Sequence, residues 1–127
     1  RFAVRNSGAT AVTEGSGDHC CEYMTGGKIV ILGSTGRNIG AGMTGGIAYI
    51  LDENDDLENK VNKEIVSIYK INNLKQEKIL LEILNEYHEK TKSLKASKVI
   101  KNWSKYKEIF KIVVPPSEEE MLDIKIQ

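Results

Sequence analysis

Residues 18–22 hold the densest group of possible metal ligands and nucleophiles in the chain, from Asp18 through His19, Cys20 and Cys21 to Glu22. A structural zinc site needs four ligands, normally as two separated pairs. Adjacent residues of a strand point to opposite faces, so the two thiols could not easily share one ion, and His19 and Cys20 diverge too far for a nucleophile–base pair. We therefore expect the thiols to fill a narrow interior, while Asp18 and His19 bond turn amides.

No second pair of ligands accompanies this group. The only other histidine is His88, which lies in a helical pattern, and the chain has no further cysteine. The sequence therefore predicts no metal site and no catalytic nucleophile.

Residues 40–45, with the sequence Gly-Ala-Gly-Met-Thr-Gly, match the dinucleotide-binding pattern G-x-G-x-x-G. That chemistry requires a helix N-terminus directly after the glycines, so that backbone N–H groups meet the pyrophosphate. Residues 46–51 instead read as a strand, which favours glycines at structural corners. Nucleotide binding, which would show as saturable binding of NAD or ATP, is the disfavoured alternative, and we predict no cofactor-binding residue.

Four polar residues near the glycines, Arg5, Asn6, Arg37 and Asn38, could face an anion or a neighbouring domain. Solvated or turn-stabilising roles are favoured for each. The sequence thus yields a scaffold without an assembled active site.

The elements that carry these residues differ between the two halves of the 127-residue chain. All eleven glycines lie between Gly8 and Gly46, whereas fourteen of the fifteen lysines follow Leu51. The 18 basic and 18 acidic residues balance, which disfavours nucleic-acid binding, and no apolar run is long enough for a membrane span. Two cysteines fit a reducing compartment. Because the chain opens on Arg1 without a methionine or signal sequence, we expect it to be part of a longer protein.

The first half contains a repeat of nineteen residues. Residues 24–32 are echoed by residues 43–51, residues 6–12 align one period earlier, and residues 65–69 form a weaker fourth copy without glycines. A short β-rich run and a glycine turn in each unit predict a right-handed parallel β-helix with coils of about nineteen residues. Strands are expected at 29–32 and 47–51, with further ones inferred around 20–24 and 38–43.

The second half is expected to form C-terminal α-helices. The first helix is predicted from an apolar stripe at helical spacing, with Asn72 or Asn73 as its N-cap; the stripe consists of Leu74, Ile79, Leu80, Ile83, Leu84 and Tyr87. A second helix is expected to begin at the N-cap Ser93 and to carry Leu94, Ala96, Val99, Ile100 and Trp103 on one face. Residues 110–114 read as a strand that Pro115 and Pro116 end, followed by a polar tail at 117–127. Trp103 and Phe110 are predicted anchors, and residues 52–56 a solvated loop. The expected domains are 1–71, the end of the β-helix, and 72–127, the helical segment.

Five stretches closely resemble the C-terminal β-helix domain of glutamate synthase, namely residues 1–9, 14–19, 21–27, 33–38 and 41–49. The resemblance continues more loosely through His88, Thr91, Ser93, Ala96, 102–103 and 110–111. Residues 113–118 look more like the ferredoxin-dependent form of cyanobacteria and plastids than the NADPH-dependent bacterial form. Cys20 stands where the family commonly has a small residue such as glycine.

The resemblance implies an enzyme that converts glutamine and 2-oxoglutarate into two glutamates. Its amidotransferase domain releases ammonia, which travels internally to a barrel domain with FMN and a 3Fe-4S cluster. No position of this chain matches a catalytic residue of the family, so the implied role is a structural brace between the glutaminase and FMN domains, with ferredoxin as electron donor. The implied location is the plastid stroma or the bacterial cytoplasm. The alternative is a non-catalytic β-helix interaction subunit of another oxidoreductase assembly.

Overall fold

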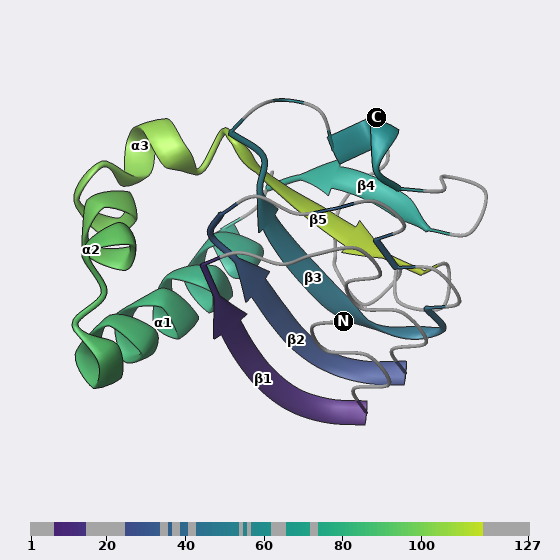
Figure 1. Ribbon diagram of the computed structural model, residues 1–127, viewed down its shortest axis with the longest axis horizontal. Helices are drawn as coiled ribbons and strands as arrows, with labels where there is room; N and C mark the ends of the chain where they lie inside the picture. The colour runs from purple at the N-terminus through teal and green to yellow at the C-terminus, as the bar shows by residue number, and fades with distance from the viewer. Residues whose placement is uncertain are drawn as a thin grey trace.

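A five-stranded mixed sheet forms the centre of the computed structural model, and three helices pack on one of its faces (Figure 1). The structure describes residues 7–14, 25–33, 36, 39–40, 43–53, 55, 57–61, 66–71 and 74–115. The sheet has the strand order β1-β2-β3-β5-β4. In chain order the elements are β1 (Ser7–Thr13), β2 (Thr25–Ile31), β3 (Gly45–Leu51), the 3-10 turn η1 (Leu57–Asn59), β4 (Ser67–Lys70), α1 (Leu74–Thr91), α2 (Leu94–Lys101), α3 (Trp103–Tyr106) and β5 (Phe110–Val114).

The nineteen-residue repeat reappears as the register of parallel strands. β2 pairs with β3 so that Lys28 lies opposite Ile47 and Ile31 opposite Ile50, nineteen residues later in each case. Between β1 and β2 an irregularity changes the offset, because Thr10 pairs with Lys28, eighteen residues on. The glycine-bounded apolar runs therefore do stack side by side, as the repeat predicts.

The prediction of a right-handed parallel β-helix is wrong. β5 pairs antiparallel with β3, and β4 pairs antiparallel with β5, so parallel stacking ends at β3 and the described strands form one open sheet. The weak fourth copy of the repeat at 65–69 contributes to β4 and does not stack on β3. The physical reason is that a strand has two hydrogen-bonding edges: β2 uses one edge of β3 in a parallel ladder, and the apolar strand β5 occupies the other edge in an antiparallel ladder.

The strands inferred at 20–24 and 38–43 are not seen as further sides of a coil. Residues 20–24 lie outside the described residues. Within 38–43, Ile39 makes a single isolated bridge to Val61 and Met43 is not in a strand. Among the described residues each repeat thus contributes one strand.

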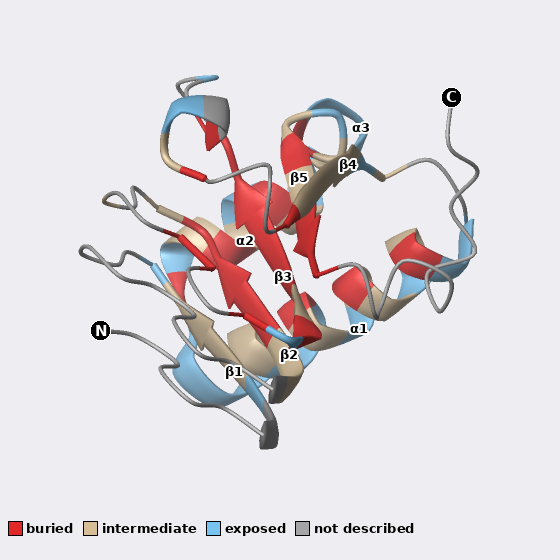
Figure 2. Ribbon diagram, turned by 90° about the vertical axis from the view of Figure 1, so that its right-hand side faces the viewer, coloured by how far each residue is buried: buried red, intermediate tan, exposed pale blue. Residues whose placement is uncertain are grey.

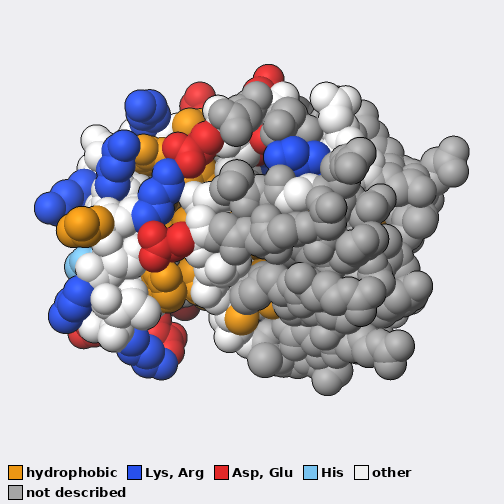
Figure 3. Space-filling view, in the orientation of Figure 1, with side chains coloured by type: hydrophobic (Ala, Val, Ile, Leu, Met, Phe, Trp, Pro, Cys, Tyr) orange, Lys and Arg blue, Asp and Glu red, His pale blue; other side chains and the backbone are white. Residues whose placement is uncertain are grey.

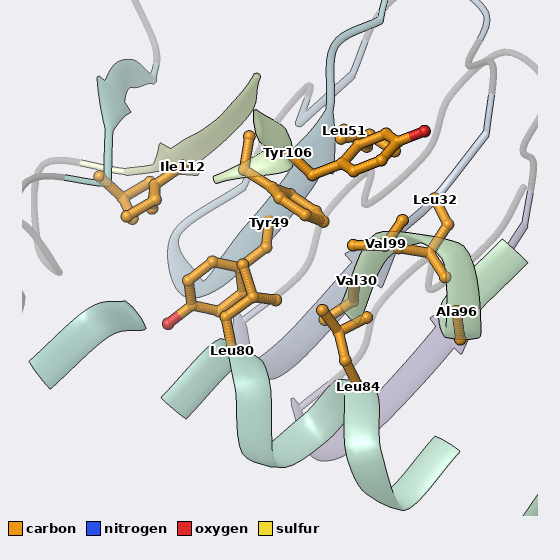
Figure 4. Packing of buried hydrophobic residues seen from close by; sticks show 12 residues of the cluster. Val30, Leu32, Tyr49, Leu51, Leu80, Leu84, Ala96, Val99, Tyr106 and Ile112 are labelled. Carbon is orange, nitrogen blue, oxygen red and sulfur yellow. The ribbon is translucent and has the colours of Figure 1, made fainter. Parts of the chain in front are cut away.

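Both faces of the sheet are buried, which explains the unbroken apolar runs. On the helix-covered face, alternate strand residues join α1, α2 and α3 in one cluster: Val30, Leu32, Tyr49, Leu51, Leu80, Leu84, Ala96, Val99, Tyr106, Phe110, Ile112 and Val114 (Figure 4). On the opposite face the intervening residues pack with loop and turn side chains, including Ile29, Ile31, Ala48, Ile50, Met43, Leu57 and Val113. β3 and β5 are consequently almost wholly buried, and β2 is buried from Ile29 to its end (Figure 2).

The helices occur where the sequence predicts them, with three corrections. Leu74 and Leu94, each the first residue of its helix, are 81% and 87% exposed and do not join the apolar faces. Trp103 begins α3 and is not part of α2, because Asn102 leaves the helical conformation at φ −114° and ψ 38°. Ser93 caps α2 as predicted, since its side chain accepts a hydrogen bond from the Ala96 N–H at 3.1 Å. The predicted caps Asn72 and Asn73 lie outside the described residues.

Candidate functional site

Most of the polar candidates lie outside the part of the chain that the structure describes. This applies to all of residues 18–22 and to Arg5, Asn6, Arg37 and Asn38. Within the described ranges, no group of three or more His, Cys, Asp or Glu side chains could hold a metal ion. His88 lies half-buried on α1.

The described glycines of this region lie in a turn and at the start of a strand, and not at the corners of a solenoid as predicted. Gly45 and Gly46 begin strand β3, and no helix follows them, so the arrangement that binds a pyrophosphate is not formed there. Gly27 and Gly46, nineteen residues apart, share positive φ values of 89° and 88°. Gly40 also has a positive φ of 74°, and a Cβ there would lie 3.4 Å from Val66 Cγ1. These glycines therefore supply conformations that other residues adopt only with strain.

An open pocket of about 480 Å³ lies between the β1–β2 edge of the sheet and α1. Val12, Ile79 and Ile83 form its apolar part, and Lys28, Lys90, Glu82 and Glu86 supply charges of both signs. Lys90 donates to Glu86 at 2.7 Å, and this hydrogen bond lowers the pKa of Glu86 and raises that of Lys90. Two of the four charged groups of the pocket, Lys90 and Glu86, are therefore bonded to each other.

Glu14 joins the end of β1 to both long helices. Its Oε2 accepts hydrogen bonds from the Tyr87 hydroxyl at 2.8 Å and from Ser93 Oγ at 3.0 Å. Burial, followed by the bond to Glu14, raises the pKa of Tyr87. In the sequence, Glu14 stands out only as part of a stretch that resembles the family. Its contacts with Tyr87 and Ser93 span more than seventy positions, so no local periodicity could predict them.

Tyr49 and Gln76 form a buried polar link between β3 and α1. The Tyr49 hydroxyl donates to Gln76 Oε1 at 2.7 Å, and the two residues are 0% and 1% exposed. Burial raises the pKa of Tyr49 to about 12. The apolar stripe predicted for α1 omitted Gln76, because an amide at a buried helix position can be recognised only once its partner is known.

Asp52 corrects the prediction of a solvated loop at 52–56. Its side chain is buried, Oδ1 accepts from the Leu57 N–H at 3.2 Å, and Oδ2 lies 3.5 Å from Lys111 Nζ. Asp55, in contrast, is exposed and has a positive φ of 53°. Asp52 thus fixes η1 against β5.

Trp103 and Phe110 anchor the helices to the sheet, as predicted. Their ring centroids lie 5.8 Å apart with the planes tilted by 45°, and Phe110 is fully buried. Trp103 Nε1 also donates to Glu77 Oε1 on α1 at 2.7 Å. One side chain therefore connects α1, α3 and β5.

Comparison with known proteins shows the family to which this scaffold belongs. A family model described as the GXGXG motif matches residues 1–116. The chain belongs to the GXGXG motif family. This GXGXG chain is 58% identical over 120 residues to "Ferredoxin-dependent glutamate synthase, chloroplastic" of Spinacia oleracea, and 57% identical over 119 residues to "Ferredoxin-dependent glutamate synthase" of Antithamnion sp.. It is 54% identical over 120 residues to "Ferredoxin-dependent glutamate synthase 2" of Synechocystis sp..

The resemblance to glutamate synthase is therefore confirmed, and its extent is well defined. In each of these three comparisons the match covers 94% of the GXGXG chain but only 7% or 8% of the relative. The chain thus corresponds to a small portion of much longer polypeptides. Within the described residues, no helix is both long and apolar enough to cross a membrane.

Proposed function

We propose that this GXGXG chain is a C-terminal part of a ferredoxin-dependent glutamate synthase, an enzyme of ammonia assimilation that makes two glutamates from glutamine, 2-oxoglutarate and a reductant. The observation that carries the proposal is the identity of 52–58% along nearly the whole chain to enzymes of that name from plants, red algae and a cyanobacterium. The plastid stroma or the cyanobacterial cytoplasm is the corresponding location, since several relatives are described as chloroplastic.

Within that enzyme we assign the chain a bracing role between the glutaminase and FMN domains. A sheet buried on both faces and tied to its helices by Glu14, Trp103 and the Tyr49–Gln76 pair is stiff, and stiffness keeps two active sites in a fixed relation. Ammonia released at one site then reaches the other without loss to solvent.

The cofactors of the proposed enzyme, FMN and a 3Fe-4S cluster, do not fit this chain. A cluster needs several cysteine thiolates, and the chain has only the adjacent Cys20 and Cys21. The glycines of residues 40–46, the one nucleotide-like motif, lead into a strand. We therefore propose that both cofactors bind to other parts of the polypeptide and that ferredoxin donates the electrons.

Sequencing of the coding region around this chain tests the proposal directly. We expect one long open reading frame with amidotransferase, flavin and cluster domains preceding Arg1. The expressed full-length protein should form glutamate from glutamine and 2-oxoglutarate with reduced ferredoxin, whereas the 127-residue chain alone should not. A stop codon directly before Arg1, or turnover by the chain alone, would contradict the proposal.

The bracing role has its own test in the full-length protein. Phe110→Ala removes a fully buried ring that contacts Trp103, a change that typically costs about 3–5 kcal/mol. We expect more glutamine to be hydrolysed than 2-oxoglutarate is consumed, so that the ratio of the two rises above the coupled value of one, with free ammonia as the difference. The exposed substitution Glu108→Ala is the matched control and should leave the ratio at one. A variant that loses both reactions equally would argue against a bracing role.

A further inference from the structure

One end of the molecule carries a cluster of lysines. Between Lys90 and Lys107 the chain has seven lysines and no aspartate or glutamate, although the whole protein has no net charge. These residues run from the end of α1 through α2 and α3. In the space-filling view the basic side chains gather at this end of the molecule (Figure 3).

Four of the lysines form the centre of this surface. Lys90, Lys95 and Lys107 are paired with Glu86, Glu53 and Glu77. The other four, Lys92, Lys98, Lys101 and Lys105, are exposed, and none forms an ion pair with a described residue. We call these four lysines together with Leu94 the lysine stripe.

Helical spacing aligns the lysine stripe. Positions 94, 98 and 101 are separated by four and three residues and so share one face of α2, and Lys105 follows in α3. The opposite face of α2 is fixed to the sheet through Ala96 and Val99, both fully buried. The stripe is therefore presented on a rigid support.

Leu94 adds an apolar contact beside the charges. It is 87% exposed, although the Ser93 cap holds the helix start in place. Leu94 thus offers one apolar contact beside lysines that form no ion pair with a described residue, although Lys105 Nζ lies 5.7 Å from the centroid of the Tyr106 ring.

We propose that the lysine stripe docks an acidic surface of a separate protein that binds reversibly. The inference rests on the charge and exposure of these residues and is independent of the proposed function. Lysine is depleted in protein interfaces as a whole, but clusters of one charge steer a partner of opposite charge and accelerate its association. A polyanionic partner of this kind complements a surface that has no acidic residue of its own between Lys90 and Lys107.

Two other classes of partner fit the surface less well. Nucleic acids are usually held by arginines and by aromatic side chains on which bases stack. The stripe has neither, and the Trp103 N–H is already bonded to Glu77. A membrane surface requires several apolar side chains on the inserted face, and the stripe offers only Leu94.

The test measures binding of the full 127-residue chain to a fluorescent helical peptide of four Glu-Glu-Leu-Ala repeats. A peptide of Gln-Gln-Leu-Ala repeats, oligo-dT and vesicles of phosphatidylcholine with phosphatidylserine are measured alongside it. We expect the acidic peptide to bind best, and its affinity to fall with added salt because exposed charges are screened. The triple variant K98E/K101E/K105E should lose at least about tenfold in affinity.

The matched control is K70E/K75E/K78E, which reverses three exposed lysines of β4 and α1 and should stay within about twofold of the unchanged chain. If K98E/K101E/K105E does not fold, as judged by circular dichroism, K98Q/K101Q/K105Q replaces it with the same expected direction. Leu94→Ser should also weaken binding. Equal losses in the stripe and control variants, or tighter binding of oligo-dT or vesicles than of the acidic peptide, would overturn the proposal.

Discussion

The Tyr49–Gln76 hydrogen bond allows the energetics of the sheet–helix interface to be measured as a double-mutant cycle. Tyr49→Phe leaves Gln76 Oε1 without this donor, and Gln76→Leu leaves the Tyr49 hydroxyl without this acceptor, in a place where both residues are at most 1% exposed. A buried polar group that loses its partner costs about 1–3 kcal/mol, so each single variant should lose that much free energy of unfolding.

The double variant Tyr49→Phe/Gln76→Leu removes both polar groups together, and replacing both partners by apolar groups is far less costly. We therefore expect it to be more stable than the sum of the single effects by about 1–2 kcal/mol. Urea unfolding of the full chain, followed by circular dichroism, measures all four proteins. Figure 4 shows the Tyr49 ring beside Leu80 of α1, so packing is preserved when only the hydroxyl is removed.

The control cycle combines Gln76→Leu with Tyr106→Phe in place of Tyr49→Phe. Tyr106→Phe removes a hydroxyl from the same core and leaves the Tyr49 hydroxyl in place. That cycle should be additive within about 0.5 kcal/mol. Additivity in the Tyr49 cycle as well would refute the view that a buried polar link holds α1 against β3.

Three further predictions concern pH, a backbone position and a cap. Burial raises the pKa of Tyr49 from 10.0 to about 12, so its contribution to stability is retained below pH 10 and is lost between pH 10 and 12, because the unfolded tyrosine loses its proton first. Urea titrations should therefore show a loss that is about 2–3 kcal/mol larger in the unchanged chain than in Tyr49→Phe. Gly46→Ala should cost about 1–2 kcal/mol in the same assay because φ is 88° there, whereas Gly46→Asn should cost less. Ser93→Ala should cost about 1 kcal/mol and lower the helical circular dichroism signal, and Ser93→Thr should restore most of both.

Local patterns predicted the elements well. The strand at 110–114, the Ser93 cap and the helix through Leu80 and Leu84 all follow from short-range spacing, and the structure has each of them. The nineteen-residue repeat likewise gave the register of β2 on β3. These features depend on neighbours in the sequence or on a period that is visible in it.

Long-range pairing could not be predicted in this way. A repeat indicates that its copies lie in parallel, but it does not show where the stacking ends, and here β5 takes the position beside β3 that a further copy would have occupied. Asp52 and Gln76 are buried polar residues, and they can be explained only from partners distant in the pattern, among them the Leu57 N–H and Lys111 for Asp52 and Tyr49 for Gln76. The candidate residues at 18–22 lie outside the described residues, so the expectation for them stays a prediction.

The position of β5 imposes an order on biosynthesis. Leu51, at the end of β3, pairs with Phe110, fifty-nine residues later, and β4 reaches the sheet only through β5. While the ribosome is still making the helices, β3 has an open hydrogen-bonding edge and β4 has no neighbour. Such an edge can recruit strands of other nascent chains, and the pairing of β5 with β3 covers it.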